Sequence, residues 1–170
     1  MGPHRHPGRR PVVPSGMGRR SAAARDETAA VIDRTLAARA PRPLALVGRS
    51  GCGKTTLLRA ALEAAGAEPM WMTARALADT IVDAIRRGAH DEVLATLVDE
   101  PHPVVIEHLE DVREMPRTLE ELRLLLEARR RRGLPVFLTL TTRPGAEGLA
   151  LWLARNAEVA KPALRPPRLD

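Results

Sequence analysis

The residues best suited to carry chemistry lie between positions 48 and 55. They read Gly48-Arg49-Ser50-Gly51-Cys52-Gly53-Lys54-Thr55, which fits the pattern G-x-x-x-x-G-K-[ST]. Glycines at this spacing let successive backbone N–H groups turn towards a phosphate, and a helix that begins at the lysine adds its partial positive charge. The spacing therefore predicts a phosphate-binding loop, in which Lys54 contacts the β- and γ-phosphates of a nucleotide and the Thr55 hydroxyl binds Mg²⁺.

The composition makes Lys54 conspicuous, because the chain holds 27 basic residues but only one other lysine, Lys161. A plain strand-to-helix turn would not require a lysine and a threonine at these places, so we prefer the binding function. We interpret Cys52 as a small filler of the loop, with a redox role as the less favoured alternative. The residues predicted to bind the nucleotide are Gly48, Arg49, Ser50, Gly51, Cys52, Gly53, Lys54, Thr55 and Thr56.

A second acidic group is expected on the metal side of such a loop, at the end of another strand. An apolar run over 104–106 ends at Glu107, which we predict to bind Mg²⁺ together with Thr55; a strand-end glutamate that faces solvent is the alternative. His108 follows, and Glu110 lies two residues further on. A histidine accepts a proton near neutral pH, but we interpret His108 as a residue that makes hydrolysis slow.

Short polar side chains end a later apolar run, at Thr139, Thr141 and Thr142. If that strand lies beside the strand that precedes the loop, such side chains are placed to sense the γ-phosphate. Taken alone, this pattern is weak support for a nucleotide site.

These groups need a frame of strands and helices to bring them together. Four short continuous apolar runs are typical of buried parallel strands, and they alternate with segments of helical spacing. Thr73 is predicted to cap one helix, and Thr118 with Glu121 forms the capping-box pattern T-x-x-E for another. The predicted strands are 44–47, 70–72, 103–106 and 135–140, and the predicted helices are 26–40, 54–65, 73–87, 90–98, 118–132 and 146–155. This alternation predicts an α/β three-layer sandwich around a parallel sheet.

Length and composition exclude several classes of protein. The 170 residues suit one domain, and a single cysteine leaves no disulfide framework and no four-cysteine zinc site. The chain is 44% apolar without any long apolar run, so we expect no transmembrane segment and no membrane partner. The first residues contain no apolar signal-peptide region, so we predict a cytoplasmic location.

The net charge of +6 comes from the N-terminal segment. Residues 1–25 hold six arginines and no acidic residue, whereas the rest of the chain is neutral overall. Residues 1–24 are also rich in proline and glycine without apolar periodicity, so we predict a disordered tail, followed by one core at 25–170. The simpler interpretation of the tail is a solvated extension; as an arm for nucleic acid, it would make only weak, nonspecific and salt-sensitive contact.

The segment Gly48–Arg59, GRSGCGKTTLLR, resembles the phosphate-binding loop of ABC transporter ATPases. That resemblance is local. No signature of the LSGGQ type follows, no aspartate–glutamate pair ends the run at 103–106, and the helical subdomain that those ATPases insert is missing.

From about Glu27 to its end, the chain resembles the AAA+ ATPase domain of the bacterial replication initiator DnaA and its regulatory homologue Hda. The family has a helix and a short strand before its loop, then a strand, a helix start of the type T/S-x-x-x-hydrophobic, and an acidic-hydrophobic helix. Its Walker B, sensor 1 and arginine-finger segments also have counterparts here, in order. The matching segments are 70–77 (MWMTARAL), 91–97, 104–110 (VVIEHLE), 141–144 (TTRP), 153–155 (LAR) and 166–170 (PPRLD).

The resemblance implies an AAA+ fold of the P-loop NTPase type that binds ATP with Mg²⁺. It implies Walker B positions for Glu107 and His108, where the family has aspartates, and a sensor 1 position for Thr142, where the family has another aspartate. It implies an arginine finger acting in trans for Arg155; an exposed arginine at a helix end is the alternative. The chain ends where the helical lid of the family begins, so we expect no lid, no sensor 2 arginine and no DNA-binding domain.

The best overall prediction is an ATP-binding, DnaA-like protein, at most a weak ATPase, that acts in replication initiation or regulates it. One alternative is a degenerate interaction module that docks on DnaA or another replication protein without nucleotide. Another is a small P-loop kinase or transport-type ATPase, although no arginine-bearing lid is evident after the second strand.

Overall fold

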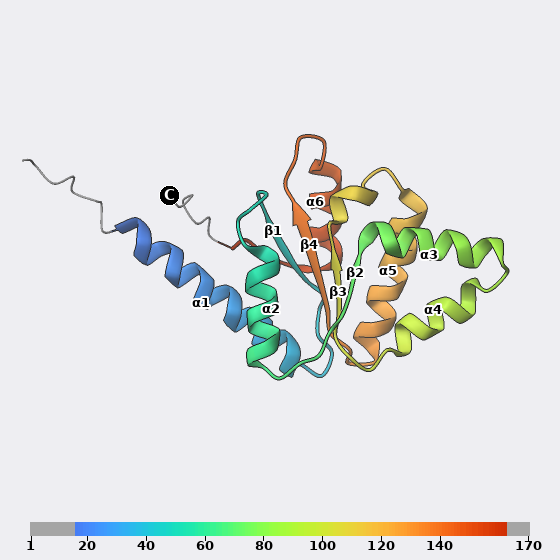
Figure 1. Ribbon diagram of the computed structural model, residues 1–170, viewed down its shortest axis with the longest axis horizontal. Helices are drawn as coiled ribbons and strands as arrows, with labels where there is room; N and C mark the ends of the chain where they lie inside the picture. The colour runs from blue at the N-terminus through green and yellow to red at the C-terminus, as the bar shows by residue number, and fades with distance from the viewer. Residues whose placement is uncertain (1–15, 163–170) are drawn as a thin grey trace, which may run out of the picture.

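The computed structural model describes the backbone of residues 16–162 (Figure 1). Most of the predicted tail and the whole 166–170 segment lie outside these residues. Within them, five strands form one sheet in the order β2-β3-β4-β1-β5, and every neighbouring pair is parallel. The strands are β1 (Leu44–Gly48), β2 (Met70–Thr73), β3 (Val104–Glu107), β4 (Val136–Thr141) and β5 (Glu158–Ala160). Because all strands run the same way, their carboxyl ends meet at one edge of the sheet.

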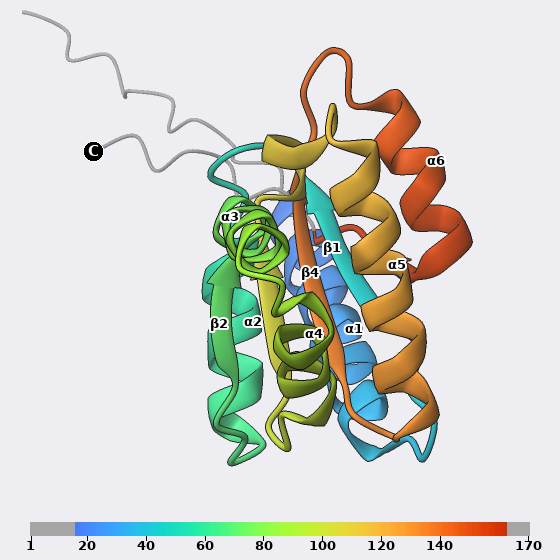
Figure 2. The same ribbon diagram turned by 90° about the vertical axis from the view of Figure 1, so that its right-hand side faces the viewer.

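Helices cover both faces of this sheet, which confirms the predicted three-layer α/β sandwich (Figures 1 and 2). The described helices are α1 (Gly16–Ala37), α2 (Lys54–Ala64), α3 (Ala74–Arg86), α4 (His90–Asp99), α5 (Pro116–Arg131) and α6 (Glu147–Asn156), with a short 3₁₀ helix η1 (Leu109–Val112). None of the helices in this part of the chain is both long and apolar enough to cross a membrane.

The alternation of side chains along β1 divides the core into two halves. Leu44 and Leu46 pack against α1 and α2, whereas Ala45 and Val47 pack against the cluster formed by α3, α5 and α6. All six residues of β4 are buried. The continuous apolar runs in the sequence therefore have a simple cause, since strands that are covered on both faces have no polar side.

Most predicted elements are confirmed, and Thr73 caps α3 as expected: its hydroxyl accepts a hydrogen bond from the Ala76 N–H at 3.0 Å. Helix α1 begins at Gly16 rather than at Asp26, so it extends into the predicted tail. The prediction gave too little weight to the three alanines at 22–24, which favour a helix. The short strand β5 was not predicted. It is only three residues long and largely exposed, so its sequence, Glu-Val-Ala, has no run of apolar residues.

The predicted capping box at Thr118 is wrong. Helix α5 begins at Pro116, Met115 precedes it without a side-chain cap, and Thr118 is buried in the first turn. Proline fits the first helical turn because its φ is already helical and its missing N–H is not needed there. Pro116 was therefore the better signal for the start of the helix.

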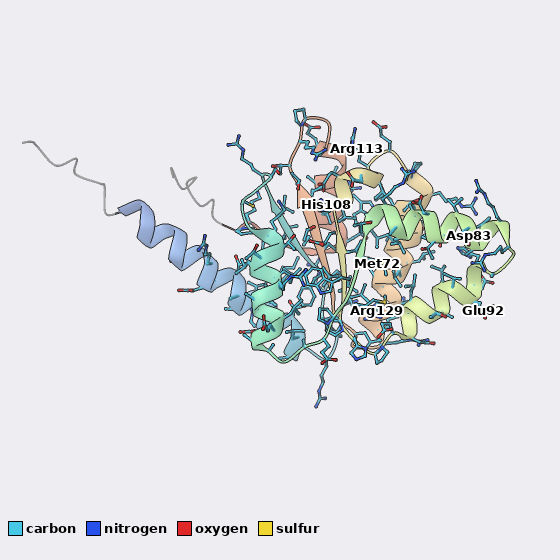
Figure 3. The ribbon with its side chains drawn as sticks, viewed as in Figure 1. Met72, Asp83, Glu92, His108, Arg113 and Arg129 are labelled. Atoms are coloured by element: carbon cyan, nitrogen blue, oxygen red, sulfur yellow. The ribbon has the colours of Figure 1, made fainter. Side chains whose placement is uncertain are left out.

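Arg129 on α5 ties several loops together from inside the protein (Figure 3). Its side chain is 0% exposed, and burial lowers the pKa of its guanidinium. The guanidinium donates hydrogen bonds to five backbone carbonyls, three of them at 2.9 Å or less. These carbonyls belong to Leu97, Val98, Glu100, His102 and Pro135. One side chain thus holds the end of α4, the loop before β3 and the turn before β4.

Replacing Arg129 with leucine removes these donors and leaves buried carbonyls unpaired. We expect Arg129→Leu to lower the free energy of unfolding by about 3 kcal/mol or more. Urea denaturation measures the loss. The matched control is Arg131→Leu on the same helix, where an exposed ion pair with Glu127 contributes less than about 1 kcal/mol. Equal, small losses in both variants would contradict the role given to Arg129.

Candidate nucleotide-binding site

The loop between β1 and α2 owes its shape to glycines at defined places. Gly51 and Gly53 have φ angles of 73° and 86°, in the left-handed region that glycine adopts without strain. Gly48 is required for another reason: a Cβ atom there would lie 2.7 Å from the Sγ atom of Cys52. The Cys52 side chain is itself buried.

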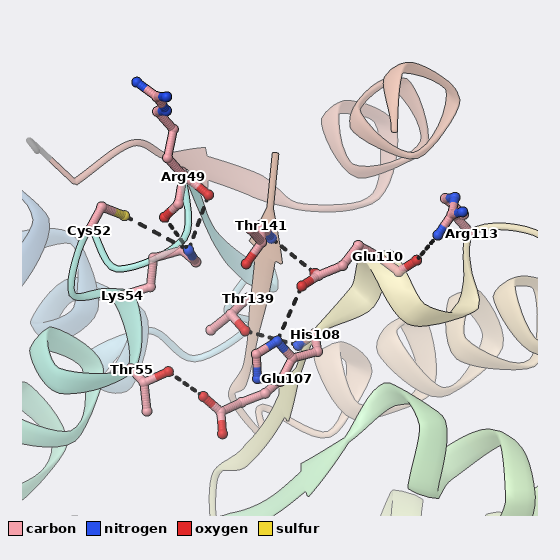
Figure 4. Close-up of polar contacts among 11 residues, drawn as sticks. Arg49, Cys52, Lys54, Thr55, Glu107, His108, Glu110, Arg113, Thr139 and Thr141 are labelled. Atoms are coloured by element: carbon pink, nitrogen blue, oxygen red, sulfur yellow. Dashed lines mark hydrogen bonds and ion pairs between the residues drawn. The ribbon is translucent and has the colours of Figure 1, made fainter. Parts of the chain in front are cut away.

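The Lys54 ammonium lies within this loop (Figure 4). Its Nζ atom donates hydrogen bonds to the carbonyls of Gly48 at 3.1 Å and Arg49 at 2.9 Å, and lies 3.8 Å from the Cys52 Sγ. The residue is only 8% exposed, and it forms no ion pair with any residue in the described ranges. A buried cation without a counter-charge is costly, so the loop is electrostatically prepared for an anion.

Thr55 and Glu107 meet between the start of α2 and the end of β3. The Thr55 hydroxyl donates a 2.5 Å hydrogen bond to Oε1 of Glu107 (Figure 4). Hydroxyl and carboxylate oxygens are ligands that Mg²⁺ accepts, usually with one or two carboxylates and the phosphates of the substrate. No group of three or more His, Cys, Asp or Glu side chains within residues 16–162 forms a metal cage.

His108 follows Glu107 in an unusual backbone conformation. Its φ of 60° is the only positive φ of a non-glycine residue in the part of the chain described. The His108 N–H donates to the Thr139 hydroxyl at 3.1 Å, and the ring Nδ1 lies 3.2 Å from Oε1 of Glu110. Left-handed backbone at such a residue costs about 1–3 kcal/mol and persists only when its surroundings hold it. The first contact holds the backbone of His108, and the second holds its imidazole.

Glu110 is a site residue to which sequence reasoning gave no role. Its side chain is 1% exposed, and its Oε2 accepts the Thr141 N–H at 2.9 Å. Burial raises the pKa of the Glu110 carboxyl, but the hydrogen bonds from Thr141 and His108 outweigh it, so the pKa lies below its ordinary value. The carboxylate thereby joins η1 to β4. Only its position two residues after His108 suggested that it is near the site.

The loop opens onto a cleft of about 270 Å³. Its lining comes from the loop, the start of α2, the residue after β3, and β4. The lining residues are Ser50, Gly51, Gly53, Lys54, Thr55, Thr56, His108, Thr139 and Thr141. Most of the predicted loop residues and His108 therefore come together at one cleft, whereas Gly48, Arg49 and Cys52 are not part of its lining.

Thr142 does not line this cleft, contrary to the sequence-based placement. Its side chain is exposed, and its N–H donates to the Gly48 carbonyl at 3.0 Å. Thr139 and Thr141 take the expected place, because residues two apart along β4 lie on the same face as the loop. Of the three threonines that the sequence analysis named, Thr139 and Thr141 therefore face the loop.

Arg155 is also far from the cleft within one chain. It lies in the last turn of α6 and lines a different pocket, with Arg42, Arg123 and Arg130. That pocket is at the edge of the sheet where the strands begin. Arg155 therefore has no contact with the loop of its own chain.

The sequence from 43 to 141 matches the AAA domain family described as the dynein-related subfamily, over more than half of the chain. The chain belongs to this AAA family. The resemblance noted in the sequence is thus confirmed at the level of family and fold. No curated protein sequence matches this AAA domain significantly.

Solved structures with a similar fold include several replication proteins. Domain III of the Thermotoga maritima replication initiation protein DnaA is 20% identical with a TM-score of 0.64, and the match covers 92% of this chain and 65% of that one. AMPPCP-bound DnaA from Aquifex aeolicus is 16% identical with a TM-score of 0.65, covering 90% and 48%. The DnaC helicase loader is 16% identical with a TM-score of 0.53, covering 82% and 90%. Identities this low show the fold alone, and this AAA domain spans about half the length of the Aquifex chain.

The contact between Gly48 and Cys52 gives a test of the loop geometry in this AAA domain. We expect Gly48→Ala to lower the free energy of unfolding by about 1–3 kcal/mol, because its Cβ overlaps the Cys52 Sγ. Cys52→Ala removes that sulfur, so the double variant is expected to lose less than Gly48→Ala alone, as urea denaturation measures. Gly148→Ala in α6 is the control, since its Cβ meets open space and alanine favours the helix. Additive losses in the double variant would show that the two residues do not interact.

Proposed function

We propose that this AAA domain binds ATP together with Mg²⁺ and hydrolyses it slowly. The observation that carries the proposal is the Lys54 ammonium, which is buried in a glycine-shaped loop with carbonyls as partners and no counter-charge among residues 16–162. A phosphate supplies the missing negative charge. A solved structure with a similar fold supports this proposal, because the Aquifex DnaA structure is bound to AMPPCP.

Two adjoining pockets at the loop are available for the two parts of a nucleotide. The phosphates fit the cleft at Lys54, where backbone N–H groups at the start of α2 also point to an anion. Next to it lies a more apolar pocket of about 340 Å³, lined in part by Arg25, Leu57 and Pro162. This pocket shares Gly51, Gly53 and Thr56 with the phosphate cleft. It is therefore placed to receive the base and the sugar.

Thr55 and Glu107 are the residues proposed to hold Mg²⁺. When bound, the ion polarises the phosphoryl oxygens and neutralises part of their charge. The chain itself contributes the hydroxyl and the carboxylate, which already lie within hydrogen-bond distance of each other. Thr141 and Thr139 are the side chains proposed to contact the terminal phosphate, in place of Thr142.

The environment of His108 supports slow hydrolysis. An imidazole supplies no negative charge to orient an attacking water, in contrast to the carboxylate of the related family. Its Nδ1 is engaged by the buried Glu110, which fixes the ring at the rim of the cleft. We propose that Glu107 binds Mg²⁺ and that His108 limits the rate of ATP hydrolysis.

The fold favours a role in replication initiation or its regulation. Similar structures include DnaA and a DnaC helicase loader, and one DnaA structure is described as bound to AMPPCP and single-stranded DNA. We propose that this AAA domain also acts in replication, with DnaA or another replication protein as its partner. We do not transfer the DNA contact of the related structure to it. Docking without nucleotide is the alternative that remains if nucleotide does not bind.

Lys54→Ala tests the nucleotide site. We expect wild-type protein to bind ATP and ADP with Mg²⁺ in isothermal titration calorimetry, and the variant to bind at least about 100-fold more weakly, because a charge-assisted contact to the phosphates is lost. Arg59→Ala on the same helix is the control, because Arg59 stacks on Trp71 rather than lining the cleft. Absence of binding in wild-type protein would contradict the proposal and favour the interaction module.

Single-turnover hydrolysis tests the roles of the residues after β3. We expect His108→Asp to raise the rate, by less than the roughly 10²–10⁴ that a well-placed base contributes, and aspartate also tolerates the left-handed backbone there. Glu107→Gln is expected to weaken Mg²⁺-dependent binding instead. His102→Asp, at an exposed histidine before β3, is the control. Fast wild-type turnover that His108→Asp abolishes would make His108 the working base and overturn this assignment.

A further inference from the structure

A second polar pocket lies on the opposite side of the molecule from the phosphate-binding loop. It has a volume of about 310 Å³ and lies where residues of α5, α6 and the start of β1 come together. Helices α5 and α6 lie next to each other in Figure 2. Pro43 precedes β1 and Asn156 ends α6, so the pocket is at the edge where the strands begin. Its size is at the lower end of the range of small-molecule sites.

Arginines dominate the lining of this pocket. Arg42, Arg123, Arg130 and Arg155 contribute four guanidinium groups, whereas Glu127 is the one carboxylate of the lining. Glu127 is shared, because it also pairs with Arg131 at 3.0 Å outside the lining. The pocket therefore has a clear excess of positive charge.

The internal contacts neutralise only part of this charge. The Arg123 guanidinium donates a bidentate pair of hydrogen bonds to the Glu120 carboxylate, at 2.6 and 3.0 Å. A guanidinium nitrogen of Arg130 lies 3.6 Å from a carboxylate oxygen of Glu127. Arg42 has only a 3.5 Å hydrogen bond to the Ala157 carbonyl, and Arg155 forms no ion pair with any residue of the described range. Two of the four guanidinium groups are thus left for a ligand.

Arg130 lines the pocket with a side chain that is 43% exposed, but one of its atoms is buried without a partner. Its Nε atom is inaccessible to solvent and has no hydrogen-bond partner in the part of the chain that the structure describes. A buried donor without an acceptor is unfavourable, because it loses its hydrogen bond to water. An oxyanion in the pocket can accept hydrogen bonds from the guanidinium groups that surround it.

We propose that this pocket binds a small anion that carries phosphoryl groups. Guanidinium groups match phosphate oxygens through paired, planar hydrogen bonds. Several guanidinium groups around one pocket suit a ligand with more than one phosphoryl group, and the volume allows it. The ligand binds to one copy of the chain, independently of the loop at Lys54. The same phosphate chemistry is available from a nucleotide held by a second copy, so the test separates these two sources.

Inorganic pyrophosphate without Mg²⁺ is the probe, used in calorimetry with the full chain. The Lys54→Ala protein isolates the pocket, because its loop no longer holds phosphate. We expect one saturable site in Lys54→Ala, and about tenfold or greater weakening when Arg42→Gln or Arg130→Gln is added.

Arg117→Gln is the matched control: it removes the same charge from α5 outside the pocket and should change the affinity less than about twofold. Circular dichroism verifies that each variant is folded, and Arg42 is exposed, so its variant remains informative if Arg130→Gln is unstable.

Three results would overturn the proposal. No saturable binding by Lys54→Ala would place all pyrophosphate at the loop. Equal weakening by Arg117→Gln and Arg42→Gln would indicate attraction by overall charge alone. Association of Lys54→Ala with ATP-loaded wild-type protein in sedimentation, without pyrophosphate binding, would assign these arginines to an interface between copies. Failure of this test leaves the nucleotide proposal untouched, because the loop is intact in the wild-type protein.

Discussion

The burial of the Lys54 ammonium is the constraint on which the site depends. To lie within the loop, the side chain needs the carbonyls of Gly48 and Arg49 turned inward. That turn requires left-handed backbone at Gly51 and Gly53, and it leaves no room for a side chain at Gly48. The buried strand β1 and the first turn of α2 then fix the two ends of the loop. A cation held this way is pre-positioned for an anion, and little rearrangement is needed when one binds.

The parallel sheet gives this cation its neighbours. Because β3 and β4 run in the same direction as β1, the residues at their carboxyl ends meet the loop: Glu107 contacts Thr55, and Thr139 and Thr141 line the cleft. Glu110 then fastens these strands to each other, since its carboxylate accepts the Thr141 N–H and contacts the His108 ring. A single buried acid thus couples the strand that ends at Glu107 to the strand proposed to contact the terminal phosphate.

The strands and the loop could be predicted because their signals are local. Continuous apolar runs follow from burial on both faces, and the loop needs glycine, lysine and threonine at fixed spacing for reasons of backbone shape and charge. The missed features depend on packing between distant segments. Which of the threonines after Leu138 faces the loop depends on the register of β4, and Glu110 is recognised as a site residue only once η1 lies against β4. The error at Thr118 has a different cause, because Pro116 two residues earlier is an equally local signal and sets the actual start of α5.

The end of α5 shows how position, not composition, assigns a role to an arginine. Arg129, Arg130 and Arg131 are consecutive, and each step along the helix turns the side chain by about 100°. Arg129 faces inward and serves backbone carbonyls, Arg130 lines the arginine pocket, and Arg131 lies exposed beside Glu127. The number of arginines at the end of α5 therefore does not say what each of them does. The guanidinium groups available to a ligand are those that the fold directs into a pocket and leaves without carboxylates.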